Sequence, residues 1–191
     1  PAEEGHFVAV VFEKVPGEQP SEHAWDDGLL MHKLGRMLAK MHLLTKKFEP
    51  SEEQYRRLDW DEDNEIVMGF IEEALSAEES AVVAMKFRAL IDEVNELPRT
   101  KDHFGLVHFD VHGGNFFMEN GEVYLFDFDD VLYTWFANDI AMVFYYGSYG
   151  FRDDAEKLKF QFSNFIKGYN EVSTFDTLWL KYLPAFLMMR R

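Results

Sequence analysis

Hydrophobic residues along the chain follow helical spacing in several long segments. Residues 29–44 carry apolar side chains at intervals of three and four, which predicts an amphipathic helix. Residues 77–97 show the same spacing and end at Pro98, which cannot continue a helix. After Asp139 the spacing returns and predicts further helices at 139–148, 153–171 and 175–190.

Short apolar runs predict strands between these helices. Residues 7–15 form one such run, which reads as a core strand, and residues 104–107 form a second. Two more runs, 115–118 and 123–126, flank Asn120-Gly121, the dipeptide that favours a type I′ turn. They predict a β-hairpin inserted between helices.

One long stretch lacks either pattern. Residues 49–65 are polar and acidic, and they predict a loop or short helical pieces, with the acidic run 59–63 solvated. Neither an internal repeat nor a low-complexity linker divides the chain. The sequence therefore predicts a mainly helical body without a convincing domain boundary.

Composition and charge limit the classes of partner that this protein is expected to bind. Hydrophobic residues make up 47% of the 191 residues, enough for a buried core, and no apolar run approaches the ~20 residues that span a bilayer. The formal charge of −16 would repel nucleic acid and anionic membranes, so neither is expected as a partner, whereas a cationic small molecule would be attracted. The absence of cysteine excludes disulfides and thiolate metal sites and fits a cytoplasmic protein.

Candidate chemistry is concentrated between residues 108 and 130. His108, Asp110 and Asn115 form an H-x-D-x-x-x-x-N pattern, and Asp127 follows Asn115 by twelve residues at the end of the returning strand. Phosphoryl transfer needs a carboxylate near the attacking hydroxyl and oxygen ligands for magnesium. Because paired strands return the chain to its starting point, the hairpin is expected to bring Asn115 and Asp127 together.

This segment resembles the catalytic loop and metal-binding aspartate of the protein-kinase-like superfamily, and most closely its aminoglycoside phosphotransferase branch, which includes choline, homoserine and fructosamine kinases. That branch shows H-G-D-x-H-x-x-N and then an aspartate after two apolar residues. The matching positions here are His108, Asp110, His112, Asn115, Asp127 and Asp129. Three further segments are similar to family patterns: 34–42, 138–141 and 165–169.

The resemblance implies a fold and two ligands. The fold is an α+β, mainly α, kinase-like C-terminal lobe with a small antiparallel hairpin and a largely absent small N-terminal lobe. Residues 1–20 would be the last small-lobe strand and hinge, where the backbone of Glu13 and Val15 bonds adenine, and 21–191 the helical lobe. The ligands are ATP and Mg²⁺, and the γ-phosphoryl group would pass to a hydroxyl of a small molecule.

The resemblance also implies residue roles. Asp110 would orient and deprotonate the acceptor hydroxyl, while Asn115 and Asp127 would bind magnesium. His108 and His112 would support the loop, and Asp139 would anchor it through backbone amides. Asp129 would assist the metal or the loop.

The sequence departs from the family pattern in two places. Phe109 stands where the branch usually has glycine, a substitution that crowds the loop. Nothing before residue 7 supplies a phosphate-covering glycine loop or its partner lysine, and Lys14 lies in the hinge. The 191 residues alone are therefore expected to be inactive, as a processed or truncated chain that lacks its N-terminal lobe.

Two other functions fit parts of the pattern. A nucleotide-binding pseudokinase or regulatory module would keep the same residues without turnover. A metallohydrolase would use His108, Asp110 and His112, because alternate residues of an extended segment share a face.

Overall fold

The computed structural model describes residues 11–50 and 56–190, and this part of the chain is mainly helical with small antiparallel sheets, as the sequence predicts. The α-helices are α1 (Leu29–Thr45), α2 (Trp60–Ala74), α3 (Ala77–Val94), α4 (Phe136–Gly147), α5 (Ala155–Asn170) and α6 (Leu183–Met189). The strands are β1 (Phe104–Val107), β2 (Phe116–Glu119), β3 (Glu122–Leu125) and β4 (Leu132–Trp135). Single 3₁₀ turns lie at η1 (Glu22–Trp25), η3 (Tyr149–Phe151) and η4 (Thr177–Lys181). No helix among the described residues is long and apolar enough to cross a membrane.

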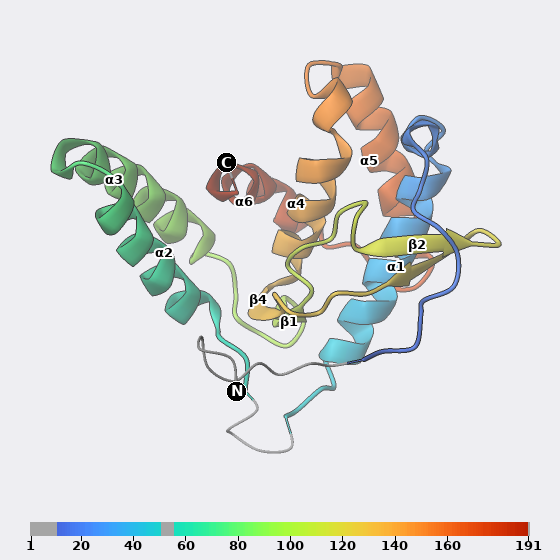
Figure 1. The fold of residues 1–191 in the computed structure, drawn as a ribbon, viewed down its shortest axis with the longest axis horizontal. Helices are drawn as coiled ribbons and strands as arrows, with labels where there is room; N and C mark the ends of the chain where they lie inside the picture. The colour runs from blue at the N-terminus through green and yellow to red at the C-terminus, as the bar shows by residue number, and fades with distance from the viewer. Residues whose placement is uncertain (1–10, 51–55, 191) are drawn as a thin grey trace, which may run out of the picture.

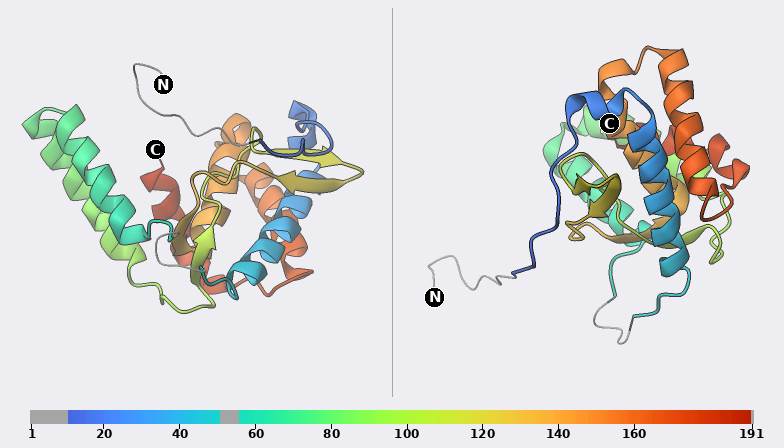
Figure 2. Two further views of the ribbon diagram at one scale, coloured as in Figure 1. Left: turned by 60° about the horizontal axis from the view of Figure 1, so that its bottom comes forward. Right: turned by 90° about the vertical axis from the view of Figure 1, so that its right-hand side faces the viewer.

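Helices α1, α4, α5 and α6 form the main body, and α2 and α3 project from it as an antiparallel pair (Figures 1 and 2). The base of this pair contacts β4 and α6. Helix α4 is the centre of the body and is almost wholly buried, with Phe136, Ile140 and Met142 in the core. The N-terminal end of α4 lies beside β1, so a rigid buried helix supports the loop that follows that strand.

Two glycines set how closely α1 and α5 approach. A Cβ atom on Gly35 would overlap the carbonyl oxygen of Phe165, and one on Gly168 would overlap that of His32. Only glycine allows this backbone contact. The helical segments 34–42 and 165–169, which resemble family patterns, therefore contain the residues that the α1–α5 packing requires.

The predicted hairpin is present. Strands β2 and β3 pair from Phe116↔Leu125 to Glu119↔Glu122. Asn120 and Gly121 connect them with φ of 52° and 75°, the two positive values that a type I′ turn needs. The other sheet pairs β1 with β4, from Phe104↔Trp135 to Val107↔Leu132. Strand β4 was not among the predicted strands.

The prediction of a loop or short helical pieces at 49–65 does not describe the last third of this stretch, where the 15-residue helix α2 begins at Trp60. The Asp59 side chain accepts hydrogen bonds from the backbone of Asp61 and Glu62, and the Glu62 side chain accepts one from the backbone of Asp59. This capping box satisfies N–H groups that have no partner within the helix. The acidic run thus starts a helix instead of remaining a solvated loop.

Two other expectations differ from the structure. Of the predicted strand 7–15, residues 7–10 lie outside the described part of the chain, and 11–15 form no regular structure. Val11 and Phe12 are 93% and 83% exposed, because no described strand pairs with them to bury their side chains. The predicted helix 175–190 is divided into η4 and α6 next to Pro184, which lacks the N–H needed to continue the earlier turn.

Replacing the helix cap tests the assignment of α2. Asp59→Ala should lower the free energy of unfolding by about 1 kcal/mol, since it leaves two backbone N–H groups without their carboxylate acceptor. Chemical denaturation followed by circular dichroism measures this loss. Glu65→Ala, on an exposed position of the same helix, is the matched control and should change stability by less than about 0.5 kcal/mol. Equal effects of the two substitutions would contradict the capping role.

Candidate active site

The loop between β1 and β2 is held from below by Asp139 at the start of α4. The fully buried Asp139 carboxylate accepts hydrogen bonds from the backbone N–H of His108 at 3.2 Å and of Phe109 at 2.7 Å. His42 of α1 adds a contact of 3.4 Å from Nε2 to the same carboxylate. This is the geometry expected of a loop anchor, and His42, which is 1% exposed, is the packed structural histidine that its helix position suggests.

His108 connects this loop to the end of the hairpin. Its ring Nε2–H donates to the carbonyl oxygen of Phe126 at 3.0 Å, which leaves Nδ1 to accept from the backbone N–H of Asp110 at 3.3 Å. Both ring nitrogens are therefore engaged inside the protein, and the side chain is fully buried. Within the described residues no group of three or more histidine, aspartate or glutamate side chains is arranged to hold a metal ion.

Asp110 lies at the tip of the loop, where its carboxylate accepts three hydrogen bonds and has the ring of His112 as a fourth neighbour. Its Oδ2 receives Nδ2 of Asn115 at 3.0 Å and lies 3.2 Å from Nε2 of His112. Its Oδ1 receives the hydroxyl of Tyr146 at 3.2 Å and Nη2 of Arg190 at 2.9 Å. The side chain is 16% exposed, so it is fixed in place yet open to the surface.

Two residues beside this carboxylate have a left-handed backbone. Phe109 has φ 69° and Asp127 has φ 64°. A bulky residue in the left-handed backbone conformation raises the free energy of the folded chain by roughly 1–2 kcal/mol, whereas glycine adopts this conformation without strain. The φ of Phe109 explains why the related pattern has glycine there, and such strain is typical of functional loops.

Asn115 and Asp127 stand at the open end of the hairpin. The backbone N–H of Phe126 donates to the carbonyl oxygen of Asn115 at 2.9 Å, which places Asp127, the next residue, beside it. Nδ2 of Asn115 donates to both the backbone oxygen and Oδ2 of Asp110, so the amide oxygen is the atom left for a cation. Asp127 is exposed. An amide oxygen and an exposed carboxylate fit a hard cation such as Mg²⁺, which binds few protein oxygens and keeps several waters.

The supporting residues surround this pair. His112 accepts the backbone N–H of Gly114 on Nδ1 at 2.9 Å, which assigns the proton to Nε2 and directs it toward Asp110. Asp129 is exposed, and its backbone oxygen accepts from Arg57 at 3.1 Å. Glu13 and Val15 lie in the extended N-terminal segment, and their backbone contact with adenine stays a prediction.

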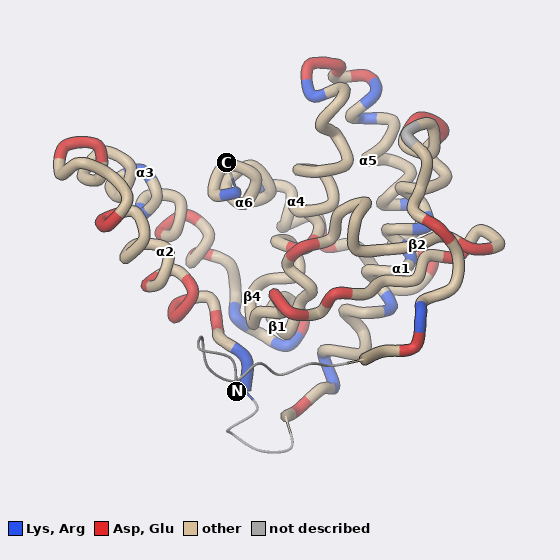
Figure 3. Tube along the Cα trace, in the orientation of Figure 1, with Lys and Arg blue, Asp and Glu red and all other residues tan. Residues whose placement is uncertain are grey.

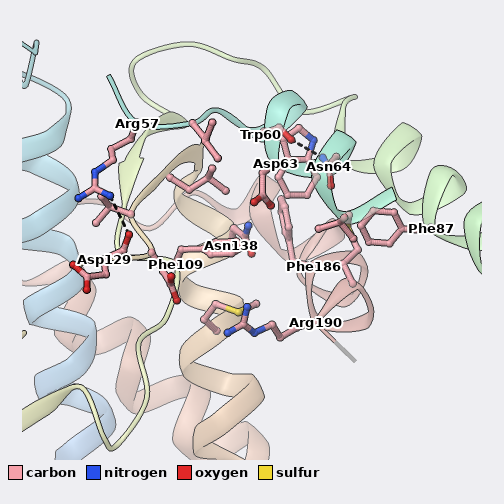
Figure 4. Close-up of a pocket in the computed structure, with 17 residues that line it drawn as sticks. Arg57, Trp60, Asp63, Asn64, Phe87, Phe109, Asp129, Asn138, Phe186 and Arg190 are labelled. Atoms are coloured by element: carbon pink, nitrogen blue, oxygen red, sulfur yellow. Dashed lines mark hydrogen bonds between the residues drawn. The ribbon is translucent and has the colours of Figure 1, made fainter. Parts of the chain in front are cut away.

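A cavity of about 440 Å³ lies between α2, α4 and α6 (Figure 4). Its lining includes Phe109, the residue before Asp110, and Arg190, which donates to the Asp110 carboxylate. Its aromatic lining comes from Trp60, Phe87, Phe109 and Phe186. Its charged lining is Arg57, Asp63, Asp129, Asp130 and Arg190. Burial raises the pKa of the Asp63 carboxyl, an effect that the positive charge of Arg190 opposes and that of nearby Asp130 reinforces.

Three residues at the site lie outside the 108–130 segment and were not predicted from the sequence. Tyr146 comes from α4 and Arg190 from the end of α6, 36 and 80 residues after Asp110. Asp63 comes from α2, which the sequence suggested was a loop. No local spacing connects these positions to residues 108–130, so only the packing of α2, α4 and α6 reveals them.

Comparison with known proteins identifies a family and relatives that resemble this chain. Residues 1–173 match the family described as the phosphotransferase enzyme family. Amicoumacin kinase of Bacillus subtilis (strain 168) is 35% identical over 190 residues, covering 97% of this chain and 55% of that protein. The chain thus spans about half the length of the curated relative.

Solved structures agree on the fold. A structure of amicoumacin kinase hAmiN in complex with AMP-PNP, Ca²⁺ and Ami is 36% identical, with a TM-score of 0.82 over 93% of this chain and 53% of that one. A microcompartment-associated aminopropanol kinase is 20% identical with a TM-score of 0.65 over 91% of this chain and 53% of that one, and it supports the fold alone.

Proposed function

The chain belongs to the phosphotransferase enzyme family, and we propose that the complete protein transfers the γ-phosphoryl group of ATP to a hydroxyl of a small, amine-bearing molecule. The observation that carries this proposal is the arrangement at the end of the hairpin. Asn115 bonds to the Asp110 carboxylate there, and its backbone oxygen accepts from Phe126, the residue before Asp127. Phe109 and Arg190, which adjoin Asp110, line a cavity large enough for a small molecule.

Each residue has a distinct part in the proposed reaction. Asp110 orients the acceptor hydroxyl and receives its proton as the hydroxyl oxygen bonds to the γ-phosphorus, while the bond to the β,γ-bridging oxygen breaks and ADP leaves. Asn115 and Asp127 hold Mg²⁺, which when bound offsets the negative charge of the phosphates. Asp129 assists this end of the hairpin.

The remaining residues keep Asp110 in position. Asp139 fixes the loop backbone through two amides, and His108 joins the loop to Phe126. His112 lies 3.2 Å from Oδ2 of Asp110, and Arg190 donates to Oδ1. Such rigid placement is what phosphoryl transfer demands of a protein, since little covalent chemistry is required of it.

The ATP side of the site involves residues outside the helical lobe. We assign 1–20 to the last small-lobe strand and hinge, with Glu13 and Val15 at adenine, and 21–191 to the large lobe. The sequence contains no glycine-rich loop with its lysine ahead of the hinge, so the 191 residues by themselves should not transfer phosphate. A cytoplasmic location, where ATP is available, fits this activity.

The cavity favours an amine on the acceptor. Asp63 and Asp130 supply negative charge next to the faces of aromatic side chains, a combination that attracts an ammonium group. Figure 3 shows acidic residues along α2 and in the loop that follows β3. Asp63 of α2 and Asp129 and Asp130 of that loop line this cavity. The relative named for amicoumacin supports a small-molecule acceptor.

Turnover on a small panel of acceptors tests the function. The complete protein with Mg²⁺ and ATP should release ADP and phosphorylate at least one of amicoumacin, aminopropanol and ethanolamine. Asp63→Asn should raise the KM for the preferred amine by about tenfold, since it removes one charge-assisted contact. The N-acetylated form of the same acceptor is the control, and its KM should not respond to the substitution.

Other outcomes point to other functions. Binding of Mg²⁺ and ATP without turnover on any acceptor would indicate the pseudokinase or regulatory module. An equal effect of Asp63→Asn on the amine and on its acetylated form would remove the amine from the proposal and leave the phosphotransferase.

A further inference from the structure

Arg190 makes the contact with Asp110 that phosphoryl transfer must break. A carboxylate offers about four lone-pair positions. Hydrogen bonds from Asn115, Tyr146 and Arg190 engage three of them here, and the remaining position on Oδ2 faces Nε2 of His112 at 3.2 Å. The acceptor hydroxyl therefore cannot bond to Asp110 until one of these donors leaves.

Three of the donors are held by a second bond within the protein. Nδ2 of Asn115 also donates to the backbone oxygen of Asp110, and Nδ1 of His112 is fixed by the N–H of Gly114. The hydroxyl of Tyr146 accepts from Nη2 of Arg190 at 2.7 Å and from Nε at 3.2 Å, so its own proton is directed to Asp110. None of these three lines the cavity.

Arg190 differs from them because it lines the cavity, and its other hydrogen bonds in this site go to the hydroxyl of Tyr146. It caps the C-terminus of α6, its side chain is 28% exposed, and it lines the cavity beside Asp110 (Figure 4). Its guanidinium lies near the faces of Phe109 and Tyr146, 5.5 and 5.6 Å from the ring centroids. A molecule that enters the cavity meets this side chain before it meets Asp110.

We propose that Arg190 occupies, in the acceptor-free protein, the place on Asp110 that the acceptor hydroxyl takes, and thereby suppresses transfer of phosphate to water. This inference rests on the function proposed above. The guanidinium acts as a stand-in for a cationic acceptor, because it presents a donor to Oδ1 of Asp110 and a positive charge to the carboxylate of Asp63. An amine-bearing acceptor replaces both, whereas water can replace the donor but not the positive charge.

The reaction that Arg190 suppresses is hydrolysis. A water oxygen would bond to the γ-phosphorus, its proton would pass to Asp110, the bond to the β,γ-bridging oxygen would break, and ADP and inorganic phosphate would leave. Asp110 must accept a hydrogen bond from that water, and with Arg190 in place no lone pair is available to it.

Acceptor-independent ADP release measures this effect in the complete protein. Arg190→Met keeps much of the length of the side chain but removes its charge and donors, and it should raise hydrolysis of Mg²⁺–ATP by about tenfold over the wild type. It should also lower the KM for the preferred amine several-fold, while kcat for transfer stays within about threefold. Arg190→Lys, which retains a charged donor, should fall between the two.

Arg88→Met is the matched control, since Arg88 is exposed on α3 and lies outside the cavity beside Asp110. It should change neither rate. Unchanged hydrolysis in Arg190→Met, or a fall in kcat for transfer without a rise in hydrolysis, would overturn the proposal and make Arg190 a promoter of transfer. Loss of transfer and hydrolysis from the wild type itself would instead reject the proposed function, and this inference with it.

Discussion

Asp110→Asn in the complete protein is expected to lower kcat for phosphoryl transfer by a factor of about 10² or more, with a much smaller change in acceptor KM. The amide keeps the size of the side chain but cannot receive the hydroxyl proton. It also turns one acceptor atom into a donor that faces the donors already present on that carboxylate. Steady-state ADP release at saturating ATP, with the acceptor varied, separates the two constants.

A matched substitution shows that the loss is chemical. Asp153→Asn changes an exposed aspartate ahead of α5, away from the cavity, and should leave kcat unchanged. The thermal midpoint of Asp110→Asn should remain within a few degrees of wild type, because the side chain sits at the edge of the core. A variant that folds normally and turns over at nearly the wild-type rate would show that Asp110 does not act on the acceptor.

Local signals predicted the elements that depend on local interactions. The apolar spacing at 29–44 corresponds to α1, and Asn120-Gly121 gave the hairpin because few residues other than asparagine and glycine accept two successive positive φ values. The H-x-D-x-x-x-x-N pattern placed His108, Asp110 and Asn115 on one loop, where short hydrogen bonds do connect them.

The elements that were missed depend on partners far away in the chain. Strand β4 forms because it pairs with β1, some 30 residues earlier. None of its own four residues is a turn residue that would mark it as a strand in the sequence. The start of α2 was not predicted because its residues are acidic. Acidic side chains stabilise the N-terminus of a helix, but in a single sequence an acidic run also resembles a solvated loop. Residues 11–15 have strand-like composition without a described partner, so composition alone overstated their order.

The same distinction applies to the candidate site. Asp139 could be proposed from its place in a motif, and its bonds to two loop amides join segments 30 residues apart. Arg190 belongs to no motif, and its contact with Asp110 arises only when α6 packs against α4. A cation that follows an apolar helix is ordinary in sequence, because it complements the helix dipole, so nothing marked it as part of a site.

Asp127→Asn is expected to have an effect as large as Asp110→Asn, but through the metal. Asparagine tolerates the left-handed backbone at this position, where φ is 64°, and it retains one oxygen, so the substitution removes the charge with little added strain. A single neutral oxygen binds Mg²⁺ more weakly than a carboxylate does. Turnover at a fixed, ordinary Mg²⁺ concentration should therefore fall by about 10² or more.

The metal dependence of this loss identifies its cause. The Mg²⁺ concentration that gives half-maximal turnover should rise at least about tenfold in Asp127→Asn, and excess Mg²⁺ should restore part of the activity, because weaker binding is offset by mass action. Glu119→Ala, an exposed acidic residue at the other end of the same hairpin, should leave the metal titration unchanged. If Asp127→Asn lost activity with an unaltered midpoint for Mg²⁺, this carboxylate would not be a metal ligand, and the pairing of Asn115 with Asp127 at the open end of the hairpin would need another explanation.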